Sequence, residues 1–426
     1  RCSSLKKISI PESVTMIGLR AFFGCSALTE VTFNDGLISI EAEAFWACNA
    51  LQTLTIPKSL NHLGPQTFCQ CTNLSSINVE SGNTTFDSRD NCNAIIETAT
   101  NTLIAGCNNT IIPSSITSIE VCAFYGMGFN NIRIPENVTS IGESAFYNCN
   151  ALNSISIPKN VTNIGSGAFA GCTNLNSITV VDENTTYDSR NNCNAIIETA
   201  TNTLIAGCNY TIIPDNIFAI GDFVFYNCSE LINIIIPNNV TTIGKYAFYN
   251  CSKLNNVTIP SNVTTIGEYA FNSCKSISKL VIPDNVTTIK KGTFSGCSNL
   301  ENLTIGKSVI SIEDYAFSGG KKINTITIKN PTPPTCGEYV FSSSITETAS
   351  IIVPQESVSL YETADTWMDF WNITGEVISG VNETIINADD NAEYYNLQGV
   401  KVSKKNLTQG VYVKKSTNKS VKVIIK

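Results

Sequence analysis

A unit of 23 residues recurs along most of this chain, and it restricts the possible fold more than any other feature. The unit reads C-x-x-L-x-x-I-x-I-P-x-x-V-T-x-I-G-x-x-A-F-x-x, and its cysteines mark the period. A 23-residue spacing separates the members of three runs: Cys2, Cys25, Cys48 and Cys71; Cys149 and Cys172; Cys228, Cys251, Cys274 and Cys297. Because so short a unit cannot bury its apolar face alone, repeated units stack on one another.

The copy that begins at Cys251 shows how one unit is built. Leu254, Val257 and Ile259 have the spacing of a short strand that feeds one face into a core. Pro260 ends that strand because it lacks the N–H that a sheet ladder requires. A second short apolar segment follows at 263–266, then a glycine at a corner where positive φ is not obligatory, and Ala270-Phe271 favours a helical turn.

One slot of the unit holds phenylalanine almost without exception. Its occupants are Phe22, Phe45, Phe68, Phe124, Phe146, Phe169, Phe225, Phe248, Phe271, Phe294, Phe317 and Phe341. Residues at one slot of a stacked repeat lie above one another, so we expect a buried column of rings along the solenoid. Deleting one buried phenylalanine typically costs about 3–5 kcal/mol, which makes this column a main source of stability.

Two nearly identical insertions interrupt the period. Asp87–Pro113 and Asp188–Pro214 are 101 residues apart and share most of their residues, which indicates a larger internal duplication. In each, N-A-I-I-E and T-L-I-A flank T-A-T-N, a pattern typical of a β-hairpin.

These patterns predict a mainly β repeat solenoid with short helical turns, a right-handed superhelix of about twelve 22–23-residue repeats. We expect the solenoid over residues 1–330, with hairpin insertions near 80–113 and 181–214. Residues 331–380 follow as the last repeat and a C-terminal cap, and residues 381–426 as a small β-module. Residues 1–5 already lie inside a repeat, so we expect an export signal to have been removed before them.

The unit resembles the BspA-like leucine-rich repeats of bacterial surface proteins over roughly residues 1–341. This resemblance implies an extracellular binding protein, and in some members adhesion to host matrix proteins or other cells. The localisation that it implies is secreted or on the outer cell surface.

The C-terminal residues carry a second resemblance. Glu393–Gly399, Gly410–Val413 and Val421–Ile425 are similar to the C-terminal sorting domain of type IX secretion, although the basic residue, Lys401, stands one position further from Gly399 than usual. From Lys401 onward there are eight lysines and no acidic residue. An ordinary β-meander with a solvated lysine face is the alternative interpretation.

The cysteines have two different settings. The ten that mark the period are expected to be buried, reduced thiols, because a cysteine ladder cannot pair every member without distortion. Cys92 with Cys107, and their copies Cys193 with Cys208, would face each other across the hairpins, so disulfides are possible there.

Catalysis and cofactor binding find little support in the residues. His62 is the only histidine and occupies a polar slot, which disfavours histidine-based triads and zinc sites. No phosphate-binding, dinucleotide-binding or EF-hand motif occurs in the sequence, so we expect no catalytic residues, no cofactor and no metal. A net charge of -8 and a pI near 4.9 argue against nucleic acid as a partner. No apolar run reaches the ~20 residues of a transmembrane helix.

A candidate binding face lies along the outward positions of the first strand. It comprises mainly hydroxyl and amide side chains: Thr32, Thr55, Asn78, Arg133, Ser156, Thr179, Thr258, Thr304 and Thr327. Such a neutral, extended surface favours an extracellular protein partner over nucleic acid, which needs a basic stripe, or sugar, which needs aromatic platforms. The same Thr and Asn ladders also stabilise a parallel sheet that binds nothing.

Three functions therefore compete at this point. The first is a cell-surface protein that binds a macromolecular partner, in adhesion to host matrix or other cells. The second is a structural spacer without a specific ligand, and the third a carbohydrate-active enzyme. The oligomeric state stays open.

Overall fold

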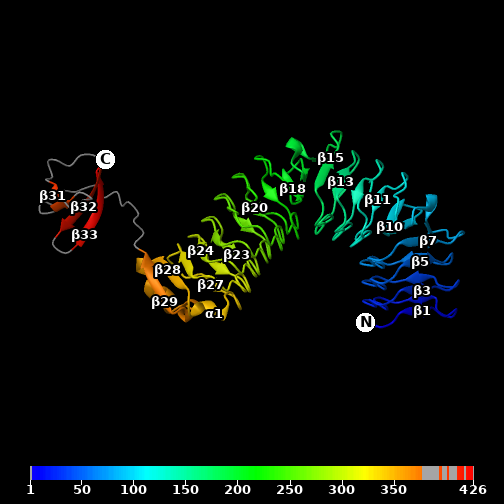
Figure 1. Ribbon diagram of the computed structural model, residues 1–426, viewed down its shortest axis with the longest axis horizontal. Helices are drawn as coiled ribbons and strands as arrows, with labels where there is room; N and C mark the ends of the chain where they lie inside the picture. Colours follow the sequence, from blue (N-terminus) through cyan, green and yellow to red (C-terminus); the bar gives the residue numbers. More distant parts are fainter. Residues whose placement is uncertain (1, 377–392, 396–400, 403–409, 417–418, 426) are drawn as a thin grey trace.

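The computed structural model describes residues 2–376, 393–395, 401–402, 410–416 and 419–425. It is mostly β, with parallel strands stacked in a solenoid of about 16 turns and very little helix, which confirms the predicted fold class. The stacked turns curve into an arch (Figure 1). The phenylalanine slot alone suggested about twelve repeats, because turns at the hairpins and in the cap lack that residue.

The first strands of the turns form parallel pairs in register with the repeat. We call this set the first-strand sheet. Its members are β1 (Lys7–Ser9), β3 (Glu30–Thr32), β5 (Thr53–Ile56), β7 (Ser76–Val79), β13 (Ser154–Ile157), β15 (Ser177–Val180), β22 (Lys279–Val281), β24 (Asn302–Ile305), β26 (Thr325–Ile328), β28 (Ser350–Pro354) and β29 (Asn372–Glu376). In most of these strands, buried side chains alternate with outward ones; Leu54 is buried between exposed Thr53 and Thr55.

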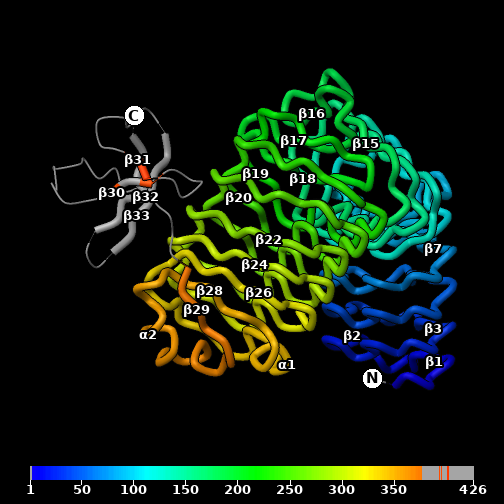
Figure 2. The backbone as a smooth tube through the Cα atoms, turned by 60° about the vertical axis from the view of Figure 1, so that its left-hand side comes forward, coloured from blue at the N-terminus to red at the C-terminus, as the bar shows by residue number. Residues whose placement is uncertain are grey.

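The second apolar segments of the turns form a parallel ladder of two-residue strands. These are β2 (Met16–Ile17), β4 (Ser39–Ile40), β6 (His62–Leu63), β11 (Ser118–Ile119), β12 (Ser140–Ile141), β14 (Asn163–Ile164), β19 (Ala219–Ile220), β20 (Thr242–Ile243), β21 (Thr265–Ile266), β23 (Thr288–Ile289), β25 (Ser311–Ile312) and β27 (Thr335–Cys336). The stacking is followed most easily in the tube of Figure 2. Both strands of the repeat occur in most turns where the sequence placed them, but the first strand expected at 254–259 is reduced to an isolated bridge between Asn233 and Asn256.

The phenylalanine segment is not a helical turn, contrary to the expectation at Ala270-Phe271. The residues two before and two after Phe271 have positive φ, Tyr269 at 54° and Ser273 at 59°, which a right-handed helix excludes. The backbone N–H of Phe271 donates to the carbonyl oxygen of Thr293 in the next turn, at 2.8 Å. Backbone N–H groups of this segment thus donate to carbonyl oxygens of the next turn, as they do between neighbouring strands.

The phenylalanine column exists, but in three pieces. Neighbouring rings have centroids 4.9–5.6 Å apart within three runs: 22, 45 and 68; 124, 146 and 169; and 225 to 341. The breaks fall at the two insertions. There the rings of Phe124 and Phe225 lie against Gly106 and Gly207, where a Cβ would come within 2.0 and 2.5 Å of the ring. A glycine replaces the missing ring of the preceding turn.

Each insertion contains the expected hairpin. In the first, β9 (Ala94–Glu97) pairs antiparallel with β10 (Thr102–Gly106), and β8 (Phe86–Asp87) adds a third strand. In the second, β17 (Ile196–Glu198) pairs with β18 (Thr203–Ala206) and β16 (Tyr187–Asp188). A short 3-10 segment joins β8 to β9 (η1, Arg89–Asn91) and β16 to β17 (η2, Arg190–Asn192). Because β10 and β18 also pair parallel with β11 and β19, each hairpin belongs to the second-strand ladder.

The residues after Phe341 close the end of the stack. They comprise α1 (Ser343–Thr346), η3 (Gln355–Ser357), α2 (Val358–Tyr361) and η4 (Trp367–Asp369), with β28 and β29 extending the first-strand sheet. Trp367 is fully buried; its ring meets that of Phe341 edge-on at 5.7 Å, and its indole N–H donates to Pro334 O at 2.8 Å. The aromatic column thus ends under a tryptophan with a satisfied N–H.

The C-terminal segment contains four strands of one antiparallel sheet. They are β30 (Glu393–Tyr395), β31 (Lys401–Val402), β32 (Gly410–Ser416) and β33 (Lys419–Ile425), in the order β31-β30-β32-β33. Gly399, which the resemblance to a sorting domain uses, lies outside the described residues.

Nine of the ten cysteines that mark the period are buried, free thiols, as expected. Their sulfurs follow a common pattern: seven donate to the carbonyl oxygen of the phenylalanine in the preceding turn, at 3.0–3.4 Å. The expectation was wrong for Cys2, which is free but exposed, because it lies at the end of the stack.

Candidate binding face

The predicted face is a ladder of outward side chains on the first-strand sheet. Seven of its nine residues are exposed, and Thr304 and Thr327 are half-buried. Several are direct neighbours in register: Thr55 pairs with Asn78, Ser156 with Thr179, and Thr304 with Thr327. The structure therefore brings the predicted residues onto one kind of surface, in short groups.

The face is not continuous, because the turn that carries each hairpin lacks a first strand. Residues 107–113 replace the usual strand with a shorter segment, and the next turn contributes only an isolated bridge at Asn131. The sheet edge left by β7 is capped by the hairpin, since the Ser88 hydroxyl accepts a hydrogen bond from the N–H of Val79 at 2.7 Å. The second insertion repeats this contact with Ser189 and Val180, at 2.8 Å.

Arg133 stands where the sheet is interrupted. It lines a depression of about 490 Å³ together with Ile111, Ile112 and Glu136. A second depression of about 240 Å³ lies on its other side and is lined by Arg133, Ser156 and Val181 among others. The one cationic member of the predicted face is therefore also the residue around which this surface is hollowed.

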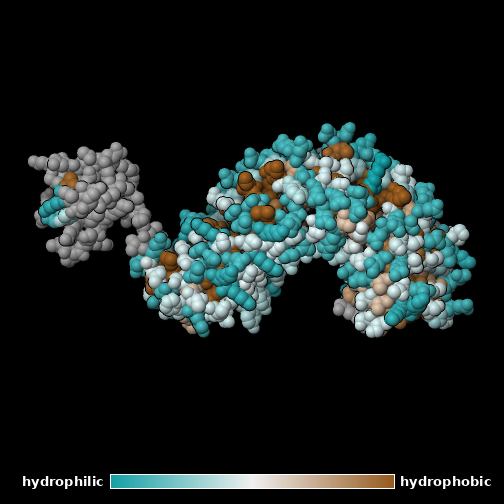
Figure 3. Space-filling view, in the orientation of Figure 1, coloured by the Kyte–Doolittle hydropathy of each residue, from teal (hydrophilic) through white to brown (hydrophobic). Residues whose placement is uncertain are grey.

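Exposed apolar side chains gather at the same junctions. Ile111 is 76% exposed, and its copy Ile212 is 73% exposed. In the second copy Ile235 occupies the position of Arg133 and is 85% exposed. Figure 3 shows brown, apolar surface over the region of β18 and β20 and around β10 and β11, within a mostly polar exterior. The sequence expectation of a mainly hydroxyl and amide face missed Ile111 and Ile212, which lie on the shortened segments.

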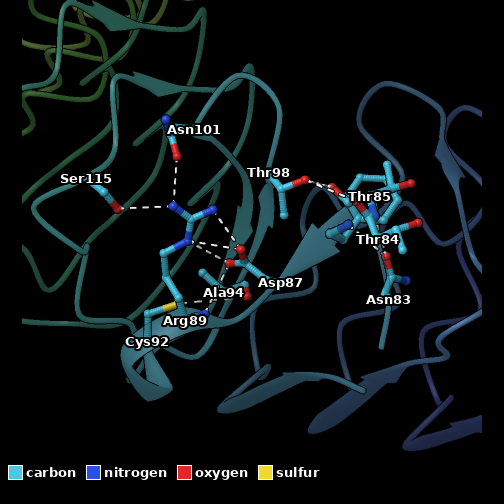
Figure 4. Close-up of polar contacts among 11 residues, drawn as sticks. Asn83, Thr84, Thr85, Asp87, Arg89, Cys92, Ala94, Thr98, Asn101 and Ser115 are labelled. Atoms are coloured by element: carbon cyan, nitrogen blue, oxygen red, sulfur yellow. Dashed lines mark hydrogen bonds and ion pairs between the residues drawn. The ribbon is translucent and has the colours of Figure 1, made fainter. Parts of the chain in front are cut away.

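A polar cluster fixes each hairpin (Figure 4). The Arg89 guanidinium binds the Asp87 carboxylate through Nε at 2.9 Å and Nη2 at 2.7 Å, and Nη1 donates to Asn101 Oδ1 at 2.8 Å. Arg190, Asp188 and Asn202 repeat the arrangement. Because the guanidinium is already bound on both edges within the protein, the cluster positions the hairpin.

The possible hairpin disulfides are not formed in this structure. Cys92, Cys107, Cys193 and Cys208 are all buried, free thiols. Cys107 Sγ lies 3.3 Å from the carbonyl oxygen of Asn93, whereas Cys92 Sγ is 3.9 Å from that of Ala94. The two thiols of a pair therefore interact with different backbone groups, and burial raises the pKa of Cys92 to about 11.

A second aromatic ladder runs beside the phenylalanine column and was not recognised in the sequence. Its members follow the phenylalanine slot directly: Phe23, Trp46, Tyr125, Tyr147, Tyr226 and Tyr249. Unlike the column, it crosses both insertions, with Trp46 and Tyr125 at 6.4 Å and Tyr147 and Tyr226 at 5.4 Å. The recurrence of an aromatic residue after the phenylalanine would have revealed it. The rings stack within each run and meet at a tilt across the two insertions, so the ladder is a structural spine.

Metal-ligating side chains do not gather in the described part of the chain. His62 is exposed, with Nε2 3.9 Å from the Glu41 carboxylate. Within the described residues, no group of three His, Cys, Asp or Glu side chains could hold a metal ion. No helix in that same part of the chain combines the length and apolarity needed to cross a membrane.

The stacked 23-residue turns, their paired parallel ladders and their phenylalanine and cysteine columns define a leucine-rich repeat solenoid. The chain matches the family described as "BspA type Leucine rich repeat region (6 copies)" over residues 1–105, 101–219, 219–348 and 288–364. It belongs to this family.

Three solved structures illustrate the likeness. A leucine-rich repeat protein from Eubacterium ventriosum has 22% identity, a TM-score of 0.55, and coverage of 82% of this chain and 84% of that one. The pneumococcal vaccine antigen PcpA has 21% identity, a TM-score of 0.50, and coverage of 87% and 79%. A leucine rich cell surface protein from Faecalibacterium prausnitzii has 26% identity, a TM-score of 0.49, and coverage of 76% and 79%. A search of curated proteins gave no match.

Proposed function

We propose that this chain is a secreted or cell-surface bacterial protein that binds an extracellular protein through its first-strand face. The observation that carries the proposal is the junction around Arg133. There an exposed hydroxyl and amide ladder meets two depressions and an exposed isoleucine, Ile111. Protein interfaces combine apolar centres with polar rims and are enriched in arginine.

The second junction strengthens the case for a protein partner over a sugar or nucleic acid. Tyr210, Ile212 and Ile235 are each more than half exposed there, and exposed apolar side chains of this kind mark interaction surfaces. The outward first-strand positions carry no aromatic platform and, apart from Arg133, no cation in the set Thr32 to Thr327. The partner therefore interacts through shape, hydrogen bonds and these apolar contacts.

The test is a binding screen of the purified chain against host matrix proteins, mucins and whole cells. Lysine is then introduced on the face as Ser156→Lys and Thr179→Lys, which are adjacent and exposed. The matched control is Thr162→Lys, an exposed hydroxyl of the same turn just before β14. We expect a saturable partner whose Kd rises at least tenfold for the face variants and is unchanged for the control.

A different outcome would redirect the proposal. If no partner binds, the chain is a structural spacer whose Thr and Asn ladders serve the sheet alone. If a partner binds and only the Thr162→Lys control weakens that binding, the binding surface lies along the second-strand ladder.

Export rests on the C-terminal segment. We assign residues 381–426 a sorting role, on the resemblance to a type IX sorting domain and the four-stranded antiparallel sheet among the described residues. The solenoid has its own cap, so this segment is not needed to close the stack.

A further inference from the structure

Cys69 and Cys122 lie outside the cysteine ladder and face each other across the first insertion. Cys69 follows Phe68 directly, and Cys122 stands two residues before Phe124. Both are buried, at 3% and 7% exposure, and both are free; burial, followed by the neighbouring Cys122 thiol, raises the pKa of Cys69. The turns that carry them are adjacent, since a Cβ at Gly126 would lie 2.6 Å from the Thr72 methyl group.

The same two slots meet elsewhere in the solenoid. Tyr226 follows its phenylalanine and Tyr246 stands two before the next one, and their ring centroids are 6.4 Å apart. Side chains in these two slots can therefore meet between adjacent turns, and on either side of the first insertion both slots hold cysteine.

The internal duplication provides a comparison within one chain. In the second copy Ala170 replaces Cys69 and Phe223 replaces Cys122. There the Ala170 methyl and the Phe223 ring both lie 3.6 Å from a Cβ placed on Gly167, and Phe223 stacks on Tyr246 at 5.0 Å. The two cysteines therefore occur together in one copy and are absent together in the other, which is the pattern of a pair.

The ladder cysteines lack such a unique partner. Cys149 and Cys172 also interact, but each donates its S–H to a phenylalanine carbonyl oxygen, at 3.0 and 3.1 Å. Met127 fills the cysteine slot before Cys149, but its neighbour Cys172 also lies beside Cys228, so a Cys149–Cys172 pairing is not unique.

We propose that Cys69 and Cys122 form a redox-sensitive pair that closes into a disulfide and locks the first junction of the solenoid. The oxidant is a low-molecular-weight disulfide. One thiolate attacks it and releases one thiol; the second cysteine attacks the resulting mixed disulfide and releases the other. In sum, two protein thiols are oxidised to one disulfide while one small disulfide is reduced to two thiols, with no change in the number of protons bound.

Formation of the disulfide should stabilise the folded protein, and burial of the thiols should make its formation slow. The bond ties two turns separated by 53 positions in the sequence, so it restricts the unfolded chain. Burial raises the pKa of Cys69, so little thiolate exists in the folded protein at neutral pH and exchange is slow. We expect oxidation over hours at pH 8 and a faster reaction as the pH rises. The proposal is independent of the binding function.

The experiment uses the full chain, incubated with glutathione disulfide, quenched with acid, digested without reduction and analysed by mass spectrometry. We expect a crosslinked peptide pair joining Cys69 to Cys122, lighter by two hydrogen atoms than the separate peptides. The oxidised protein should unfold a few degrees higher, and dithiothreitol should reverse both changes.

Two variants and a control complete the test. Cys69→Ala copies the residue of the second insertion and is expected to fold but to give no crosslink; Cys122→Ser should do the same. The control Cys149→Ala should retain the Cys69–Cys122 crosslink in full. Free, alkylatable Cys69 and Cys122 after oxidation, a mixed disulfide that never resolves, or crosslinks spread over the ladder cysteines would overturn the proposal.

Discussion

The thiol of Cys274 donates a hydrogen bond to the carbonyl oxygen of Phe248, 26 residues earlier, at 3.1 Å. The same oxygen accepts a hydrogen bond from the backbone N–H of Cys251. It therefore bonds both within its own turn and to the next turn. The two most regular residues of the repeat are therefore linked through one backbone atom. Cysteine suits this position because it is a small, largely apolar side chain that still has one donor.

Replacing Cys274 by alanine should destabilise the protein by about 1–2 kcal/mol, from the lost hydrogen bond and a small cavity. Equilibrium unfolding in urea under reducing conditions measures this. Cys2→Ala is the matched control and should change nothing, because Cys2 is exposed. Equal effects of the two substitutions would contradict the role assigned to the thiol.

Stability should fall at alkaline pH because the ladder thiols are buried. Burial raises the pKa of Cys297 from 9.0 to about 12. A group whose pKa is raised in the folded state stabilises that state fully below its unfolded pKa, and the contribution is lost as the pH rises through the folded pKa. The contribution of Cys297 should therefore be constant up to about pH 8 and decrease between about pH 9 and 12. Thermal unfolding in reducing buffer should show a smaller alkaline decline for Cys297→Ala than for the unaltered protein; identical declines would rule the thiol out.

Much of this fold could be predicted from the sequence, because a repeat of constant length transmits its register from turn to turn. The strands around Leu54 and Leu303, the buried cysteines and the hairpins follow from spacing alone. The interruptions could not be predicted in the same way. The phenylalanine column breaks at Gly106 and Gly207 because the hairpin takes the place of a ring, and this depends on how the strands pair.

The candidate binding face could likewise be predicted from the sequence only in part. The outward position of Thr55 or Ser156 follows from alternation along a strand, whereas the depressions around Arg133 arise from a strand that is missing. Shortened segments such as 107–113 leave Ile111 exposed, although its pattern in the sequence is that of a core residue. Only the three-dimensional packing of adjacent turns distinguishes these cases.

Close backbone approach restricts some of the corner glycines and not others, and this gives a matched pair of substitutions. At Gly267 an added Cβ would lie 2.5 Å from the carbonyl carbon of Gly244, whereas at Gly18 it would meet nothing within 4 Å. Gly267→Ala should cost about 1–3 kcal/mol through overpacking, and Gly18→Ala should stay within about 0.5 kcal/mol. Urea unfolding of both variants checks the contrast, and a neutral Gly267→Ala would show that the turns can separate freely.

A buried ring of the phenylalanine column should contribute far more to the free energy of unfolding than an exposed apolar side chain does. Phe271 is fully buried between Phe248 and Phe294, with ring centroids 4.9 and 5.5 Å away. Phe271→Ala should destabilise by about 3–5 kcal/mol. Ile235→Ala, at an 85% exposed position, is the control and should have almost no effect on unfolding. A loss below about 1 kcal/mol at Phe271 would mean that the stack relaxes around the cavity.

The last prediction separates export from folding. Deleting residues 381–426 should leave the solenoid folded, because Trp367 and Phe370 already cover the final ring of the column at Phe341. The truncated protein should therefore keep its circular dichroism spectrum and its unfolding midpoint within about 2 °C. If the segment is a sorting signal, the truncated protein should accumulate inside the native host while the full chain reaches the surface, as measured by surface proteolysis of intact cells. A double substitution that only reverses charge in the lysine-rich segment, Lys414→Glu with Lys415→Glu, is a milder comparison that keeps the segment in place. Surface display of the truncated protein at the level of the full chain would assign residues 381–426 a structural role and remove the support for export through this segment.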